Sequence, residues 1–284
     1  MRGRGGFIGA NVTPASAAVN SAASGVWTVR EAEALKRAGT WPRLFQAPTE
    51  FTGLQLWLDA SDASTLFNAT TGGSLVAADG TVKRWADKSG NNRHATEATN
   101  GPTRKASQIN NLDALQFNGT SNFLQGSSSP ASGNTRTVFI VGKSNLATGS
   151  ELFQIGLYRA TGFCGFLLRQ LAVGNDWYVS GDVSTNNCYV ASRQLTITSP
   201  FLACVRQSST TSLQYFHNRT SYNVVGSLGS FQANPGYFIG KARSDIDLTF
   251  WGGSVGEVIV YDYALSDTDR AAVEAYLIAK WGIA

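Results

Sequence analysis

Short segments in which apolar and polar residues alternate fill most of the chain after residue 50. Alternation with a period of two residues is typical of strands that bury one face. The segments lie at 54–58, 82–85, 114–118, 122–125, 137–143, 152–158, 163–169, 177–180, 189–192, 201–207, 213–217, 237–241 and 255–261. About a dozen short strands separated by turn residues predict an all-β protein, built as a two-sheet antiparallel jelly-roll sandwich. Gly119-Thr120-Ser121 between two of these segments predicts a tight hairpin.

Two helices are predicted, one on each side of the strand-rich region. Ser266-x-x-Asp269 is an N-terminal capping pattern, and it is followed by apolar residues at helical spacing up to Trp281 and then by Gly282. This pattern predicts a C-terminal helix over 267–281. Thr28-x-x-Glu31 is a capping box that predicts a short helix over 29–38.

Residues 1–50 differ from the rest of the chain. Residues 1–24 are rich in Gly, Ala, Ser and Asn and show no periodicity, and the helix that follows is too short to be stable alone. We therefore expect an extended docking arm over 1–50, and a separate domain over 51–284. The arm should bind other proteins or further copies of the chain, and a trimer is expected. Its expected contact residues are Phe7, Ile8, Trp27, Leu35 and Trp41.

Charge and hydropathy narrow the function classes. The chain has 284 residues and a net charge of +4, and only 15% of its residues are charged. Residues 51–284 hold 17 basic and 16 acidic side chains, which argues against a nucleic-acid surface. No apolar run is long enough to span a membrane, and the N-terminal region has no apolar core of a secretory signal peptide. An exposed β protein without such a signal is typical of a virion protein, assembled in the host cytoplasm and released by lysis.

Four segments carry a family resemblance: Leu56-Trp57-Leu58-Asp59-Ala60-Ser61-Asp62, Val82-x-x-Trp85-x-Asp87-x-Ser89-Gly90-Asn91-Asn92, Leu115-x-Phe117-Asn118-Gly119-x-x-Asn122-Phe123-Leu124, and Trp251 to Asp262 with the terminal helix. In this order they resemble the laminin-G-like and pentraxin-like jelly rolls of the concanavalin A-like lectin/glucanase superfamily. The resemblance implies the fold of residues 51–284 and leaves the activity open. The segment from Ser24 to Pro42 resembles the start of tailed-phage structural proteins, which implies that the arm attaches to a virion.

Candidate binding residues come from two patterns. Asp87, Asn91 and Asn92 in the loop 87–92 offer oxygen ligands suited to Ca²⁺, and the alternative is an Asx turn in which the loop bonds to its own backbone. Trp177, Tyr178 and Tyr222 lie near loops, where they are expected either to contact a glycan or to join a small hydrophobic core.

No catalytic residue is predicted. Gly252-Gly253-Ser254-Val255-Gly256 matches the G-x-S-x-G pattern, but a strand follows the serine and both histidines precede it. Glucanases of this superfamily carry three carboxylates on one strand, whereas here only Asp245 and Asp247 share a face. We expect a non-enzymatic virion protein, a head decoration, fibre or tail component that displays a lectin-like domain to host-surface polysaccharide. The alternatives are a secreted bacterial carbohydrate-binding module and, with less support, a glycoside hydrolase.

Overall fold

The computed structural model describes residues 26–38, 41, 45–131, 133–145, 198–209, 211–222, 224, 236–241 and 250–284, and the backbone alone of 150–159, 162–170, 177–182, 187–190 and 225. The chain divides into two compact units, Met1–Ala47 and Pro48–Ala284.

The first unit contains the helix α1 (Val29–Arg37). The predicted capping box is present, since the hydroxyl of Thr28 accepts from the Glu31 N–H at 3.2 Å and the Glu31 carboxylate accepts from the Thr28 N–H at 2.8 Å. None of the residues of α1 is buried, and Val29 is 78% exposed. The helix is therefore capped by its own sequence but obtains little stabilisation from packing.

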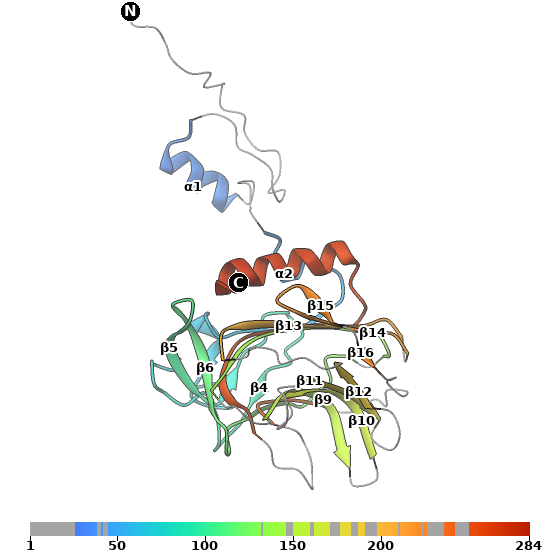
Figure 1. The fold of residues 1–284 in the computed structure, drawn as a ribbon. Coiled ribbons are helices and arrows are strands. Elements are labelled where there is room, and N and C mark those ends of the chain that lie inside the picture. Colours follow the sequence, from blue (N-terminus) through green and yellow to red (C-terminus); the bar gives the residue numbers. More distant parts are fainter. Residues whose placement is uncertain are drawn as a thin grey trace, which may run out of the picture. The chain divides into compact units, whose positions relative to one another are not determined.

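The second unit is a sandwich of two antiparallel sheets (Figure 1), which confirms the predicted fold class. Within the described residues, the eight-stranded sheet has the order β15-β14-β13-β8-β18-β6-β5, with β1 also paired to β18. Its strands are β1 (Leu54–Asp59), β5 (Thr103–Ile109), β6 (Leu112–Asn118), β8 (Arg136–Ser144), β13 (Phe201–Gln207), β14 (Leu213–His217), β15 (Thr220–Tyr222) and β18 (Gly252–Tyr261).

The ten-stranded sheet, again within the described residues, has the order β16-β12-β11-β10-β9-β17-β7-β4-β3-β2. Its strands are β2 (Leu66–Phe67), β3 (Arg84–Trp85), β4 (Ala95–Thr96), β7 (Leu124–Gly126), β9 (Ser150–Arg159), β10 (Gly162–Gln170), β11 (Trp177–Asp182), β12 (Asn187–Val190), β16 (Val224–Val225) and β17 (Tyr237–Ile239). Two short 3-10 helices, η1 (Pro48–Glu50) and η2 (Ala63–Thr65), flank β1.

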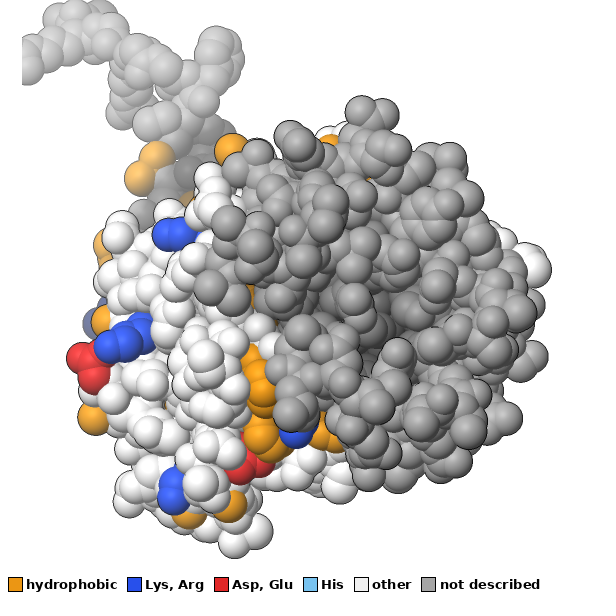
Figure 2. Space-filling view, turned by 60° about the horizontal axis from the view of Figure 1, so that its bottom comes forward, with side chains coloured by type: hydrophobic (Ala, Val, Ile, Leu, Met, Phe, Trp, Pro, Cys, Tyr) orange, Lys and Arg blue, Asp and Glu red, His pale blue; other side chains and the backbone are white. Residues whose placement is uncertain are grey.

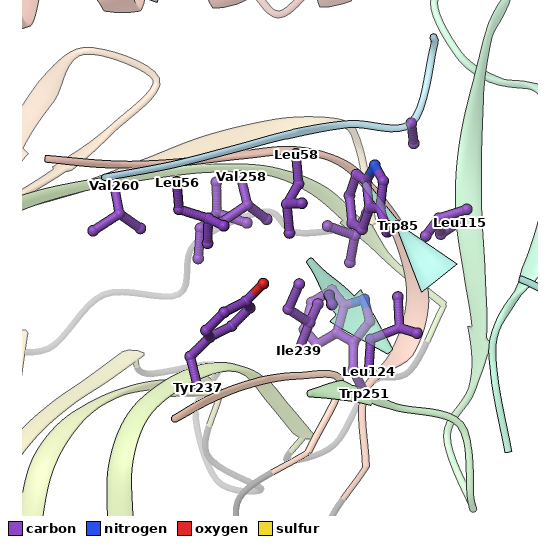
Figure 3. Close-up of a cluster of buried hydrophobic side chains, with 14 of the residues drawn as sticks. Leu56, Leu58, Trp85, Leu115, Leu124, Tyr237, Ile239, Trp251, Val258 and Val260 are labelled. Carbon is purple, nitrogen blue, oxygen red and sulfur yellow. The ribbon is translucent and has the colours of Figure 1, made fainter. Parts of the chain in front are cut away.

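A hydrophobic core fills the space between the two sheets (Figure 3). Side chains from the eight-stranded sheet meet those from the ten-stranded sheet, with Leu56, Leu58, Val258 and Val260 on one side and Leu124, Tyr237 and Ile239 on the other. Trp85 and Trp251 are fully buried in the same core, as expected for tryptophans in strand patterns.

A second core lies on the other face of the eight-stranded sheet, under α2 (Asp267–Trp281). The helix begins at the predicted cap, where Ser266 accepts from the Asp269 N–H, and Gly282 ends it in the left-handed conformation. Val273, Leu277 and Trp281 face the sheet and pack with alternate residues of β18 such as Ile259. Strand β18 is thus buried on both faces, and α2 covers the eight-stranded sheet (Figure 1).

The predicted hairpin at Gly119 is wrong. β6 belongs to the eight-stranded sheet and β7 to the ten-stranded sheet, so the chain crosses the sandwich at this turn. The side chain of Asn118 accepts from the N–H groups of Thr120, Ser121 and Asn122, which closes a compact turn without pairing the strands. Both strands then bury apolar side chains in the same core from opposite sides. The turn residues alone do not determine whether the two strands pair or join different sheets.

One buried carboxylate joins α2 to the sheet. Glu257 of β18 is 1% exposed and accepts four hydrogen bonds. Its Oε1 receives the indole N–H of Trp57 at 2.7 Å and the hydroxyl of Tyr276 at 2.9 Å. Its Oε2 receives the Lys280 ammonium at 2.8 Å and the indole N–H of Trp281 at 2.7 Å. Burial, together with the charge of Asp59, raises the pKa of Glu257, and Lys280 opposes this rise.

We predict that Glu257→Gln lowers the free energy of unfolding by about 3–5 kcal/mol, because the substitution removes one of the two carboxylate partners of Lys280 and turns an amide donor toward other donors. Urea denaturation measures the loss. Asp79→Asn is the matched control, since Asp79 forms an exposed pair with Lys105, and it should cost less than about 1 kcal/mol. Equal losses in the two variants would contradict the role given to Glu257.

Candidate ligand-binding face

Five described residues form one row across the ten-stranded sheet. The register pairs Phe67 with Arg84, Arg84 with Thr96, Thr96 with Gln125 and Gln125 with Phe238. Their neighbours along the chain, Leu66, Trp85, Ala95, Leu124 and Ile239, are all fully buried in the core between the sheets. Because successive side chains of a strand point to opposite faces, the five residues lie on the face away from the core. We call them the outer row.

The outer row continues through strands of which only the backbone is described. Phe238 pairs with Gln154, Gln154 with Leu167, Leu167 with Ser180 and Ser180 with Asn187. The register positions of Arg169, Tyr178 and Tyr189 form a second line on the same face. The face therefore extends without interruption from β2 to β12, and its positions are mostly aromatic or neutral polar.

Two cations lie against aromatic rings near the outer row. The guanidinium carbon of Arg84 is 4.0 Å from the ring centroid of Phe67. The ammonium of Lys241 is 3.6 Å from the ring centroid of Phe123 and 5.6 Å from that of Phe238. Such cation–π contacts hold a positive charge in place without neutralising it.

Figure 2 views the sandwich from the side of the ten-stranded sheet. On the described part of this face, uncharged polar side chains and backbone predominate, hydrophobic side chains gather in one strip, and charged side chains are few. Gln125 is exposed and Thr96 is half-buried, so an amide and a hydroxyl lie between the Arg84 and Phe238 ends of the row. Aromatic rings beside such groups can contact the C–H faces and the hydroxyls of a sugar.

The three predicted glycan-contacting residues are not brought together. Trp177 and Tyr178 follow each other in β11, so their positions lie on opposite faces of the sheet, and only that of Tyr178 is on the outer face. Tyr222 belongs to the eight-stranded sheet, where it is half-buried, packs against the core and lies 6.3 Å from Tyr215 between ring centroids. Sequence reasoning missed Phe67 and Arg84, because strands of two residues are too short to show alternation.

The loop 87–92 forms the Asx turn that was the alternative to a calcium site. The carboxylate of Asp87 accepts from the N–H groups of Trp57, Ser89 and Arg93 at 2.9–3.0 Å and from the Ser89 hydroxyl at 2.8 Å. The Asn91 amide donates to the Leu54 carbonyl at 3.0 Å, and Asn92 has φ 55°. Within the described ranges, no cluster of three or more His, Cys, Asp or Glu could hold a metal ion. Calcium binding stays a prediction.

The carboxylates of Asp59 and Asp62, near the loop 87–92, form ion pairs with lysine side chains. Lys88 is 3.0 Å from Asp59 and 2.9 Å from Asp62, and Lys280 is 2.7 Å from Asp59. Burial alone would raise the pKa of Asp59, but Lys280 and Lys88 outweigh it and lower that pKa. The hydrogen bond from Lys88 is the largest cause that lowers the pKa of Asp62.

The remaining predicted residues lie in or near the arm, or outside the described part. Trp27, Leu35 and Trp41 are half-buried within the first unit, where the rings of Trp27 and Trp41 meet edge to face at 5.7 Å. Phe7 and Ile8 lie outside the described residues, as do Asp245 and Asp247. Among the described helices, none is long and apolar enough to cross a membrane.

Searches against protein-family models and against curated protein sequences gave no match. Solved structures show a similar fold. Trypanosoma rangeli sialidase in complex with sialic acid matches with a TM-score of 0.56 and 14% identity, over 86% of this chain and 35% of that one. An HCR/D mutant matches with a TM-score of 0.51 and 14% identity, over 80% and 52%. This chain thus spans about a third of the length of the sialidase and about half of HCR/D, and the likeness shows the fold alone.

We predict that the stability cost of Lys88→Met depends on pH. A carboxyl group whose pKa is lowered by folding contributes stability above its unfolded value of about 3.9 and loses it as the pH falls through the folded value. The cost should therefore be largest above about pH 5 and shrink toward pH 3, as measured by urea denaturation at each pH. Lys105→Met, which removes the exposed partner of Asp79, should cost less than about 1 kcal/mol throughout. A cost of Lys88→Met that stays constant with pH would contradict the assignment.

Proposed function

We propose that this chain is a non-enzymatic, carbohydrate-binding protein of a tailed-phage virion. The sandwich is displayed on the particle surface and binds cell-surface polysaccharide, and residues 1–50 attach it to other virion proteins. The observation that carries the carbohydrate-binding part is the outer row, a continuous face of aromatic and neutral polar residues on the ten-stranded sheet. The opposite large face of the sandwich is covered by α2, which leaves this face for a ligand.

The composition of the outer row suits a saccharide. Phe67 brings a half-buried ring, Thr96 and Gln125 bring a hydroxyl and an amide, and the backbone continues the face to Tyr178. Sugars present both apolar C–H faces and hydroxyls, so such a mixed surface can satisfy both. A sandwich of similar fold occurs in a sialidase that was solved with sialic acid, which is compatible with this assignment.

The carboxylates of the sandwich favour binding over hydrolysis. Glycoside hydrolysis requires two carboxyl groups that flank the scissile bond. The described members of the outer row, Phe67, Arg84, Thr96, Gln125 and Phe238, include no carboxylate. Glu257 and Asp59 are buried beneath α2 and paired with Lys280, so they serve the fold.

The first unit supports attachment to a larger assembly. α1 is capped by its own residues yet buries none of them, and its apolar residue Val29 is 78% exposed. A helix of nine residues is marginal in water unless it packs against something. We assign that role to neighbouring virion proteins and to further copies of the chain, with a trimer as the expected assembly.

Glycan binding is tested with the full chain on an array of bacterial polysaccharides. We expect Tyr178→Ala to weaken binding by about tenfold, because an aromatic contact with a sugar contributes on the order of 1 kcal/mol or more. Tyr263→Ala is the matched control, since Tyr263 is half-buried against the core beneath α2 and away from the outer row, and this variant should bind as the unchanged chain does. Absence of binding to every glycan, or equal binding by the Tyr178→Ala variant, would count against the proposed face.

Virion attachment is tested by deleting residues 1–47 and recovering particles from a host that carries the gene. The full chain should co-sediment with particles and the truncated chain should stay in solution, with light scattering showing a trimer only for the full chain. If the truncated chain still joins particles, the arm is not the attachment segment. If neither chain joins particles while both bind glycan, the protein is a secreted carbohydrate-binding module.

A further inference from the structure

Arg84 has no acceptor among the described residues. Its Nε is buried without a hydrogen-bond partner, and the guanidinium lies over the ring of Phe67 instead of beside an acid. Two other arginines of the sandwich form ion pairs with acids. Arg104 pairs with Asp113 at 2.7 Å, and Arg206 pairs with Asp267 at 2.8 Å. A buried N–H without an acceptor is costly to the fold, so the position of Arg84 on the outer row requires an explanation.

Two carboxylates lie near Arg84 in the sequence or after the neighbouring strand β4, and both already accept hydrogen bonds from other groups. Asp87, three residues later, accepts four hydrogen bonds within its own turn and from β1. Glu97, which follows β4, accepts from the N–H groups of Thr99 and Asn100. The fold therefore holds Arg84 by packing and leaves its charge for something outside the described chain.

We infer that Arg84 binds a carboxylate of an acidic polysaccharide. The inference rests on the proposed function and names the ligand class for the same face. A guanidinium offers N–H donors in a planar fork that matches a carboxylate in two parallel hydrogen bonds. The ring of Phe67 lies against the guanidinium of Arg84 and limits the rotation of this side chain. The loss of side-chain entropy on ligand binding is therefore smaller than for a freely rotating arginine.

A second cation, Lys241, lies near the end of the outer row that is formed by Phe238. Lys241 contacts the ring of Phe123 and lies near Phe238, which is three strands away from Arg84 in the sheet. Because neighbouring strands are about 4.8 Å apart, Arg84 and Phe238 are separated by about 14 Å across the sheet. Thr96 and Gln125 lie between them and can bond to sugar hydroxyls. A guanidinium with neutral polar groups beside it suits a polymer that carries both carboxylates and hydroxyls.

The test uses the full chain and matched pairs of glycans. The probes are polygalacturonate with its carboxyl-reduced form, sialylated glycans with their desialylated forms, and sulfated glycans without carboxylates. We expect binding to the carboxylated members, weakened by added salt. Arg84→Gln should reduce that binding by about tenfold or more, and Arg84→Lys should reduce it less, because lysine keeps the charge without the fork. Arg219→Gln, an exposed arginine at the turn before β15, is the charge-matched control and should have no effect.

The outcomes separate the inference from the proposed function. Preference for neutral or sulfated glycans, or carboxylate binding that Arg84→Gln and Arg84→Lys leave unchanged, would overturn the inference while carbohydrate binding stands. Absence of binding to any glycan would overturn both. Circular dichroism confirms that each variant is folded, and the Arg84→Lys variant keeps the test valid if Arg84→Gln is unstable.

Discussion

The carboxylate of Glu257 lies in the middle of β18, the strand that contributes to both hydrophobic cores, and it receives donors from β1 and from three residues of α2. A buried charge is tolerated only when its hydrogen-bonding capacity is filled, so the carboxylate fixes the positions of all four donors. This constraint holds α2 on the outer face of the eight-stranded sheet. A sheet-binding ligand is thereby directed to the other sheet.

On the ten-stranded sheet, the inward residues of the described strands build the core between the two sheets. Trp85 and Leu124 are fully buried, whereas their chain neighbours on the outer row are half-buried (Arg84) or exposed (Gln125). Other charged side chains of the sandwich form ion pairs with one another, such as Lys88 with Asp59 and Arg104 with Asp113. What the face offers a ligand is therefore aromatic and neutral polar, with Arg84 as a charge that no described residue accepts.

Much of the fold could be predicted from the sequence, because it depends on local patterns. The cap at Ser266 and the glycine at 282 define α2, and the alternation in 255–261 defines the centre of β18. The prediction of a hairpin at Gly119 was wrong, because the residues of a turn do not determine whether the two flanking strands pair with each other or join different sheets. The site was harder to find. Phe67 and Arg84 lie in β2 and β3, whereas Phe238 lies in β17, so only the register of the sheet aligns residues that are far apart in the sequence. Trp177, Tyr178 and Tyr222 were predicted from their positions near loops, and such positions do not reveal that Tyr222 belongs to the other sheet.

Carbohydrate binding at the outer face of the ten-stranded sheet can be tested with a crystal structure of the full chain and the oligosaccharide that it binds most tightly. Sugar density is expected against the outer row, with the ring of Phe67 and the guanidinium of Arg84 in contact with the ligand. Sugar bound only at α2, at the eight-stranded sheet or at the loop 87–92 would contradict it.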